Sequence, residues 1–247
     1  MDVKLTLAGV AIGLLAATTA LAASDEPPPM TANALEHLIS RPHTIAEIEA
    51  GIIALPNAPI SPGQKGGDTP LGRVGRGDAT LQAGVHVLYR FQKDYIVGAG
   101  IVFSPFGTSD DQYGGLSRLA RTHTRSYLFL GVEGRYVPLR YKSFEGWFGL
   151  SGGGVIVADR FHTEAPPVPP ILGVPDVTIR TEGFAIGVQA GATYYLSESW
   201  IAGANLRGYH WILPEGRQCS PIGDCATLAG SVQVFELGLT IGYRLPL

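Results

Sequence analysis

Eight stretches of this chain alternate apolar with polar residues, and the breaks between them are alternately short and long. The short breaks include 92–94 and 197–199, whereas the long ones are rich in glycine and proline. Strict alternation places apolar side chains on one face of a strand and polar side chains on the other. Even-stranded barrels of bacterial outer membranes join such strands by tight turns at one rim and long loops at the other. The pattern therefore predicts an all-β chain, an eight-stranded antiparallel up-and-down transmembrane β-barrel located in the bacterial outer membrane.

The composition agrees with this class and excludes others. Only 16% of the 247 residues are charged, and the mean hydropathy is +0.17. No run of 18 apolar residues follows the N-terminal region, which excludes a helical membrane protein. The net charge of −3 provides no basic field, so nucleic acid is not an expected partner. We expect no cofactor.

The N-terminus has the features of an export signal over residues 1–22, with a basic start, an apolar run and small residues at its end. Cleavage after Ala22 and cleavage after Ala23 fit equally well. A periplasmic lead-in segment is expected over 23–42 and the barrel over 43–247.

The chain has two cysteines, Cys219 and Cys225. An exported protein folds in an oxidising compartment, so a disulfide that closes a small surface loop is expected. A metal site is the poorer interpretation, because two thiols without a nearby histidine do not complete a zinc shell.

Charged side chains on the alternating stretches indicate which face meets lipid. An arginine on the lipid face near the midplane costs about 2–4 kcal/mol, so these side chains should point inward. An eight-stranded barrel has an interior that side chains can fill, and we expect ion pairs there. The residues expected in the lumen are Glu47, Glu49, Arg90, Glu133, Arg135, Arg207, Glu236 and Arg244. A soluble barrel would instead bury the apolar faces. The facing of the glycine-rich stretch 146–158 stays open.

Counting from a periplasmic N-terminus, alternate connections face outward and should be long. They are expected at 56–78, 104–122, 159–177 and 214–229. The three periplasmic connections are shorter, and 138–145 is the longest of them.

The last alternating stretch carries a polar residue, a glycine, an apolar residue and an aromatic residue at Glu236, Gly238, Ile241 and Tyr243. This segment is similar to the C-terminal signal read by the barrel assembly machinery. With the export signal and eight strands, the chain from about residue 43 resembles the small eight-stranded outer-membrane proteins, of which the outer membrane protein A barrel is an example. The resemblance implies that fold and the assembly machinery as a partner. The tail 244–247 departs from it, because family members commonly end at an aromatic residue.

Two short motifs have ordinary structural explanations. Gly149 to Gly153 matches the Gly-x-Ser-x-Gly nucleophile pattern, with Ser151 at its centre. That pattern requires a strand-to-helix turn, whereas here it lies within a strand, where small residues leave room for large neighbours. Arg76 to Asp78 spells an adhesion tripeptide, but a loop turn is the simpler interpretation. No catalytic residue is assigned.

Histidines and arginines near the outer rim suggest contacts with lipid. His123, His162 and His210 lie where lipid-modifying barrel enzymes keep catalytic groups, but the His–Ser spacing of the deacylases is missing after His123. The arginines that could contact lipopolysaccharide phosphates are Arg118, Arg121 and Arg125. A solvated loop face explains these arginines equally well.

We therefore expect an integral outer-membrane barrel with a lumen filled by side chains and a structural or surface-interaction role through its long loops. Outer-membrane lipid, lipopolysaccharide and surface ligands are its expected partners. The alternatives are a lipid-modifying enzyme of the lipid A deacylase or acyltransferase type, and a narrow channel for small molecules. Enzymatic activity is the less favoured of these interpretations.

Overall fold

A computed structural model describes residues 41–56, 63–64, 78–110, 121–163, 176–216, 218–221 and 224–246. The expected export signal and nearly all of the lead-in lie outside these residues. Within the described ranges, no helix has the length and apolar character needed to cross a membrane.

Long antiparallel strands make up the described chain. The long strands are β1 (His43–Leu55), β3 (Asp78–Gln92), β4 (Tyr95–Phe103), β6 (Arg121–Tyr141), β7 (Phe144–Thr163), β8 (Val177–Tyr195), β9 (Trp200–Ile212) and β11 (Ser231–Pro246). The short strands are β2 (Gly63–Gln64), β5 (Thr108–Asp110) and β10 (Asp224–Cys225).

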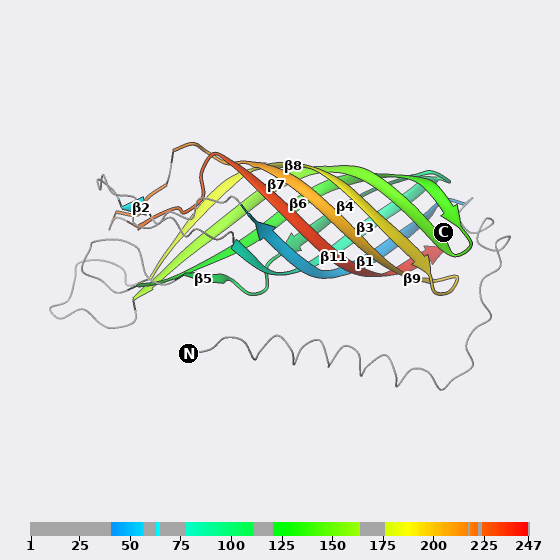
Figure 1. Cartoon of the computed structure of the whole chain (residues 1–247), viewed down its shortest axis with the longest axis horizontal. Helices are drawn as coiled ribbons and strands as arrows, with labels where there is room; N and C mark the ends of the chain where they lie inside the picture. The colour runs from blue at the N-terminus through cyan, green and yellow to red at the C-terminus, as the bar shows by residue number, and fades with distance from the viewer. Residues whose placement is uncertain are drawn as a thin grey trace, which may run out of the picture.

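These strands close into a barrel, as Figure 1 shows. Each long strand pairs with the next long strand along the chain, and β1 pairs with β11 to close the ring of eight. The short strand β5 continues the wall of the barrel, because it pairs with the N-terminal part of β6. Short turns and the C-terminus lie at one end of the barrel, and β2 and β5 lie at the other. Short turns mark the periplasmic end of outer-membrane barrels, so we call this the short-turn end.

Successive side chains of each strand point alternately outward and inward. The outward side chains are mostly apolar, whereas the buried inward ones include both polar and apolar residues. Outward side chains such as Ile48, Leu130 and Val188 are about 60% exposed, which suits lipid and not water. Aromatic side chains form an outward row near the short-turn end, where Tyr95 and Tyr136 have ring centroids 5.3 Å apart. Trp and Tyr are enriched at membrane–water interfaces. The eight-stranded antiparallel barrel predicted from the alternation is confirmed.

The facing of the fifth long strand, which the sequence left open, is clear in the structure. On β7 the side chains of Trp147, Ser151 and Val155 point inward and are buried, whereas Phe148 and Leu150 point outward. The inward face keeps its bulky residues at both ends of the glycine-rich run. The small residues lie between them.

Some strand boundaries differ from the prediction. The connection expected at 138–145 is a two-residue turn at Lys142 and Ser143, because β6 continues past Pro138. The pairing with β7 is irregular between Tyr136 and Leu139, and such an irregularity accommodates a residue without an N–H donor. At the opposite end, β6 and β7 extend into the segments expected to be loops, since their inward side chains remain buried up to His123 and Phe161.

Candidate functional site in the barrel interior

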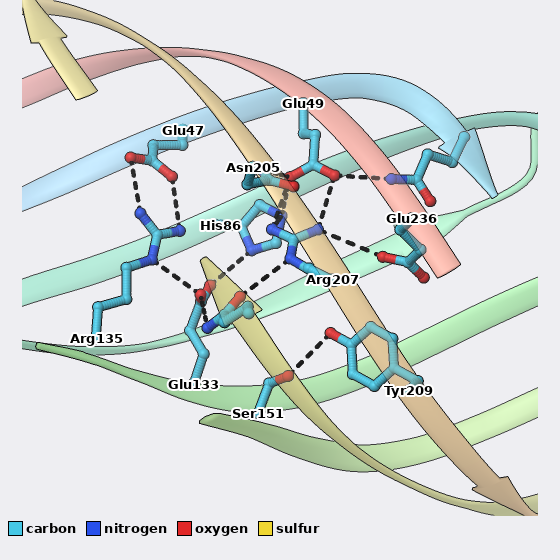
Figure 2. A network of polar contacts seen from close by, with 12 residues as sticks. Glu47, Glu49, His86, Glu133, Arg135, Ser151, Asn205, Arg207, Tyr209 and Glu236 are labelled. Atoms are coloured by element: carbon cyan, nitrogen blue, oxygen red, sulfur yellow. Dashed lines mark hydrogen bonds and ion pairs between the residues drawn. The ribbon is translucent and has the colours of Figure 1, made fainter. Parts of the chain in front are cut away.

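Glu49 lies at the centre of a buried polar network inside the barrel (Figure 2). Nη1 and Nη2 of Arg207 each donate to one of its carboxylate oxygens at 2.7 Å. The side-chain amides of Gln82 and Asn205 donate to the same carboxylate at 2.9 and 3.0 Å. His86 Nε2 lies 3.3 Å from Glu49 Oε2. This buried charge is therefore held by a two-pronged ion pair with further donors around it.

His86 joins this group to a second set of charges. Its Nδ1 atom lies 2.9 Å from Glu133 Oε1, so both ring nitrogens face carboxylates. Glu133 Oε2 accepts hydrogen bonds from Arg135 Nε at 3.0 Å and from Gln189 Nε2 at 2.9 Å. Arg135 continues to Glu47 at 3.0 Å. The network thus extends across the lumen and joins side chains from β1, β3, β6, β8 and β9.

A glycine on the inward face makes room for the central carboxylate. Gly51 on β1, Gly238 on β11 and Asn205 on β9 lie in one register row. A Cβ atom on Gly238 would lie 2.6 Å from Glu49 Oε1 and 2.9 Å from Asn205 Oδ1. Any side chain at Gly238 would therefore displace Glu49, which explains the glycine at this position.

A second polar group lies at the short-turn end. Arg90 Nη2 contacts Glu145 Oε2 at 2.5 Å, and Tyr195 donates its hydroxyl to the same oxygen at 2.9 Å. Arg140 contacts Glu145 at 3.0 Å and Asp94 at 2.6 Å. The apolar cluster of this end lies on the same inward faces. It comprises Ile45, Leu88, Ile96, Val137, Trp147, Tyr195 and Ile201.

A larger apolar cluster lies on the loop side of the central network. Its aromatic members pack in pairs, with Phe129 and Tyr209 at 5.1 Å and Tyr127 and Trp211 at 5.6 Å between ring centroids. Leu228 belongs to this cluster although it lies in the connection between β9 and β11. That connection therefore reaches back into the mouth of the barrel.

The mouth contains a third polar group. Arg125 is fully buried and contacts Asp78 at 2.8 Å and Asp159 at 3.3 Å. Asp159 accepts a hydrogen bond from the backbone N–H of Thr227 at 3.0 Å, and the Thr227 hydroxyl donates to it at 2.5 Å. His123 Nε2 lies 2.7 Å from Asp159 Oδ1. These contacts fix Thr227 to the inner wall.

The predicted disulfide is present and lies beside this inserted segment. Cys219 and Cys225 are bonded, and the backbone of Ala226 donates to the carbonyl oxygen of Gln218 at 2.8 Å. Residues 225–228 are at most 2% exposed. The disulfide therefore restrains the part of the connection that enters the mouth.

Replacing Cys225 with serine is expected to lower the free energy of unfolding by about 2 kcal/mol, since the bond closes only a short loop in the unfolded chain. The inserted segment should also become accessible, because its end loses a restraint. Urea unfolding with and without reductant, and hydrogen exchange at the Thr227 amide, measure the two effects. Equal exchange in the serine variant and the oxidised protein would show that the disulfide does not hold this segment.

The structure places the residues expected in the lumen on inward faces, where all are buried. Seven of the eight have charged partners inside the barrel, including Glu236, whose Oε2 lies 3.5 Å from Arg207 Nη1. Arg244 instead donates to the backbone carbonyl oxygen of Glu198 at 3.1 Å. Sequence reasoning did not select His86 or the amide side chains, although their positions on the inward faces of the predicted strands were the available signal. It also did not select Glu145, which fell in the connection expected at 138–145 and lies on β7 in the structure.

The rim residues fit their expected roles less well. Arg125 points into the barrel mouth with 0% exposure, so its assignment as a lipopolysaccharide contact is wrong. Its charge is neutralised by the two aspartates of the inner wall. Arg118 lies outside the described residues, and the side chain of Arg121 is not described.

The rim histidines and the serine of the Gly-x-Ser-x-Gly motif lie in different surroundings. His123 is buried and points inward, whereas His162 is exposed and His210 contacts Ser231 and Gln233 on the outer face. Ser151 is 8% exposed and donates its hydroxyl to the Tyr209 hydroxyl oxygen at 3.1 Å. Among the described residues, the hydrogen-bond partner of the Ser151 hydroxyl is therefore a tyrosine of the inner wall and not the histidine that usually activates a serine nucleophile.

No family model matches the sequence, and no curated protein matches it. Solved structures do match. A major outer membrane protein from Thermus thermophilus has a TM-score of 0.53 at 13% identity, covering 83% of this chain and 99% of that one. The chain has the fold of small outer-membrane barrels. Neisserial surface protein A matches with a TM-score of 0.49 at 11% identity over 82% and 97% of the two chains. OprG from Pseudomonas aeruginosa gives 0.44 at 14% identity over 85% and 99%.

In this outer-membrane barrel, the residues of the expected assembly signal lie on the strand that closes the ring. Glu236 and Gly238 face the lumen, and Ile241 and Tyr243 face outward with 51% and 39% exposure. The motif therefore combines a lumen face and a lipid face of β11.

Proposed function

We propose that this protein is a non-conducting outer-membrane barrel with a structural or surface-interaction role. The observation that carries the proposal is the filling of the interior at successive levels. Two polar groups and the central network alternate with two apolar clusters, and residues 225–228 lie across the mouth. An ion would have to pass buried apolar layers, where an unpaired charge is strongly disfavoured.

The long strands support the surface-interaction part of the proposal. A tilted strand crosses the bilayer with about 9–11 residues. β6 has 21 residues and β7 has 20, compared with 9 in β4. On the outer face of β7, Arg160 and His162 follow the apolar row and are 63% and 54% exposed by side chain. One side of the wall therefore rises beyond the membrane, where it is available to other molecules.

Planar-bilayer recordings test the proposal. The oxidised protein should give no single-channel steps, and neither should the Cys225→Ser variant, because the layers below the mouth remain. Steps in the serine variant alone would identify the inserted segment as a gate and favour the channel alternative. Steps in both proteins would contradict the proposal. A change in lipid A mass on expression in a bacterial host would favour the enzyme alternative.

A further inference from the structure

A hollow of about 530 Å³ opens on the outer wall of the barrel near the short-turn end. Gly134 on β6 lies at its floor, between Val97 on β4 and Leu150 on β7 in the strand register. A Cβ atom on Gly134 would meet no heavy atom within 4 Å beyond its immediate neighbours. Bulky outward side chains surround a position without one, so the hollow faces the hydrocarbon part of the bilayer.

Aromatic rings line the edge of the hollow that is nearest the periplasm. Phe91 stacks with Tyr95 at 6.1 Å, Tyr95 packs with Tyr136 at 5.3 Å, and Tyr136 packs edge-on with Phe148 at 5.3 Å. Tyrosine is favoured at the level of lipid headgroups. The hollow therefore extends from the headgroup level toward the bilayer centre, as a phospholipid chain does.

The charge next to this aromatic edge is positive. Lys93 and Lys142 lie in the two short turns, and the contact of Arg140 with Asp94 ties these turns together. Glu145 pairs with both Arg140 and Arg90, so these two guanidinium groups together balance the charges of Asp94 and Glu145. Basic residues at this level attract anionic headgroups.

We propose that the hollow binds one anionic phospholipid of the inner leaflet. One acyl chain lies against Gly134 between Val97 and Leu150, and the phosphate lies toward Lys142. The chain is held by packing contacts, since the surrounding lipid is as apolar as the protein wall. This inference does not depend on whether the lumen conducts.

Native mass spectrometry after release from nanodiscs tests the proposal. The discs contain equal amounts of phosphatidylglycerol and phosphatidylcholine with identical chains. The wild-type protein should retain one phosphatidylglycerol. Gly134→Leu should lower that retention about tenfold, which corresponds to about 1.4 kcal/mol. Gly154→Leu is the matched control, because Gly154 also faces outward and a Cβ there would have only one contact, at 4.0 Å. This control should retain lipid as the wild type does.

Two further variants separate the parts of the proposal. Val97→Phe fills the hollow from the neighbouring strand and should also lower retention, which keeps the test open if Gly134→Leu does not fold. Lys142→Gln should reduce the preference for phosphatidylglycerol over phosphatidylcholine without lowering total lipid retention. Equal retention by the Gly134→Leu and Gly154→Leu variants would overturn the chain site. Equal retention of the two lipids by the wild type would overturn the headgroup assignment.

Discussion

Glu49→Ala is expected to lower the free energy of unfolding by about 3–5 kcal/mol, because it leaves the buried guanidinium of Arg207 without its main partner. The side chains of Glu49 and Arg207 are 0% and 1% exposed, so water cannot replace the lost contact without entering the lumen. Gln82 and Asn205 also lose their acceptor. Equilibrium unfolding in urea, followed by the heat-modifiable gel shift, measures the change.

The control is Glu182→Ala, which removes an exposed glutamate from the outer face of β8. Its effect should be small, since surface substitutions usually change stability by less than about 0.5 kcal/mol. A double variant, Glu49→Ala with Arg207→Met, should recover part of the loss because the buried guanidinium is removed together with its main partner. The recovery should be incomplete, since Glu236 then loses its contact with Arg207. If Glu49→Ala and Glu182→Ala had equal stabilities, the central network would not contribute to the stability of the barrel.

Val132→Arg is expected to cost about 2–4 kcal/mol in membrane insertion, the penalty for a cation near the bilayer midplane on the lipid face of a barrel. Val132 is 65% exposed on the outer face of β6, between the rows of β4 and β7. The folded fraction in phospholipid vesicles across a urea series measures the change.

The same substitution at Thr178 is the matched control. Thr178 also points outward, but it lies at the far end of β8 beside Arg160, beyond the apolar row. Thr178→Arg should insert as the wild type does. If both arginine variants inserted equally well, the face assigned to lipid would be wrong.

The residues of the central network show how far the alternation along a strand predicts the position of a side chain. Alternation placed Glu49, Arg135 and Arg207 on inward faces, because a strand turns successive side chains to opposite sides. It also excluded the lipid face for them on energetic grounds. Alternation does not give the level of a residue along the barrel axis, because that level depends on strand register. Partner choice therefore came from the register, which places Arg207 opposite Glu236 and Asn205 opposite Gly238.

Arg125 shows a different limit of the sequence. Its alternation on β6 indicated an inward side chain, whereas its neighbours Arg118 and Arg121 suggested a basic surface cluster. Burial beside Asp78 and Asp159 depends on residues 47 and 34 positions away, and on a loop that inserts Thr227. Local sequence carries no information on such contacts.

The sequence by itself determined the barrel, the number of long strands and the face of each strand that meets lipid, apart from the glycine-rich β7. It could do so because these features depend on a local period of two and on the cost of charge in lipid. Tertiary structure alone decided which charges pair, which connection enters the mouth and where the outer wall is hollow. These depend on strand register and on the volumes of side chains that meet across the barrel, which no single stretch of chain specifies.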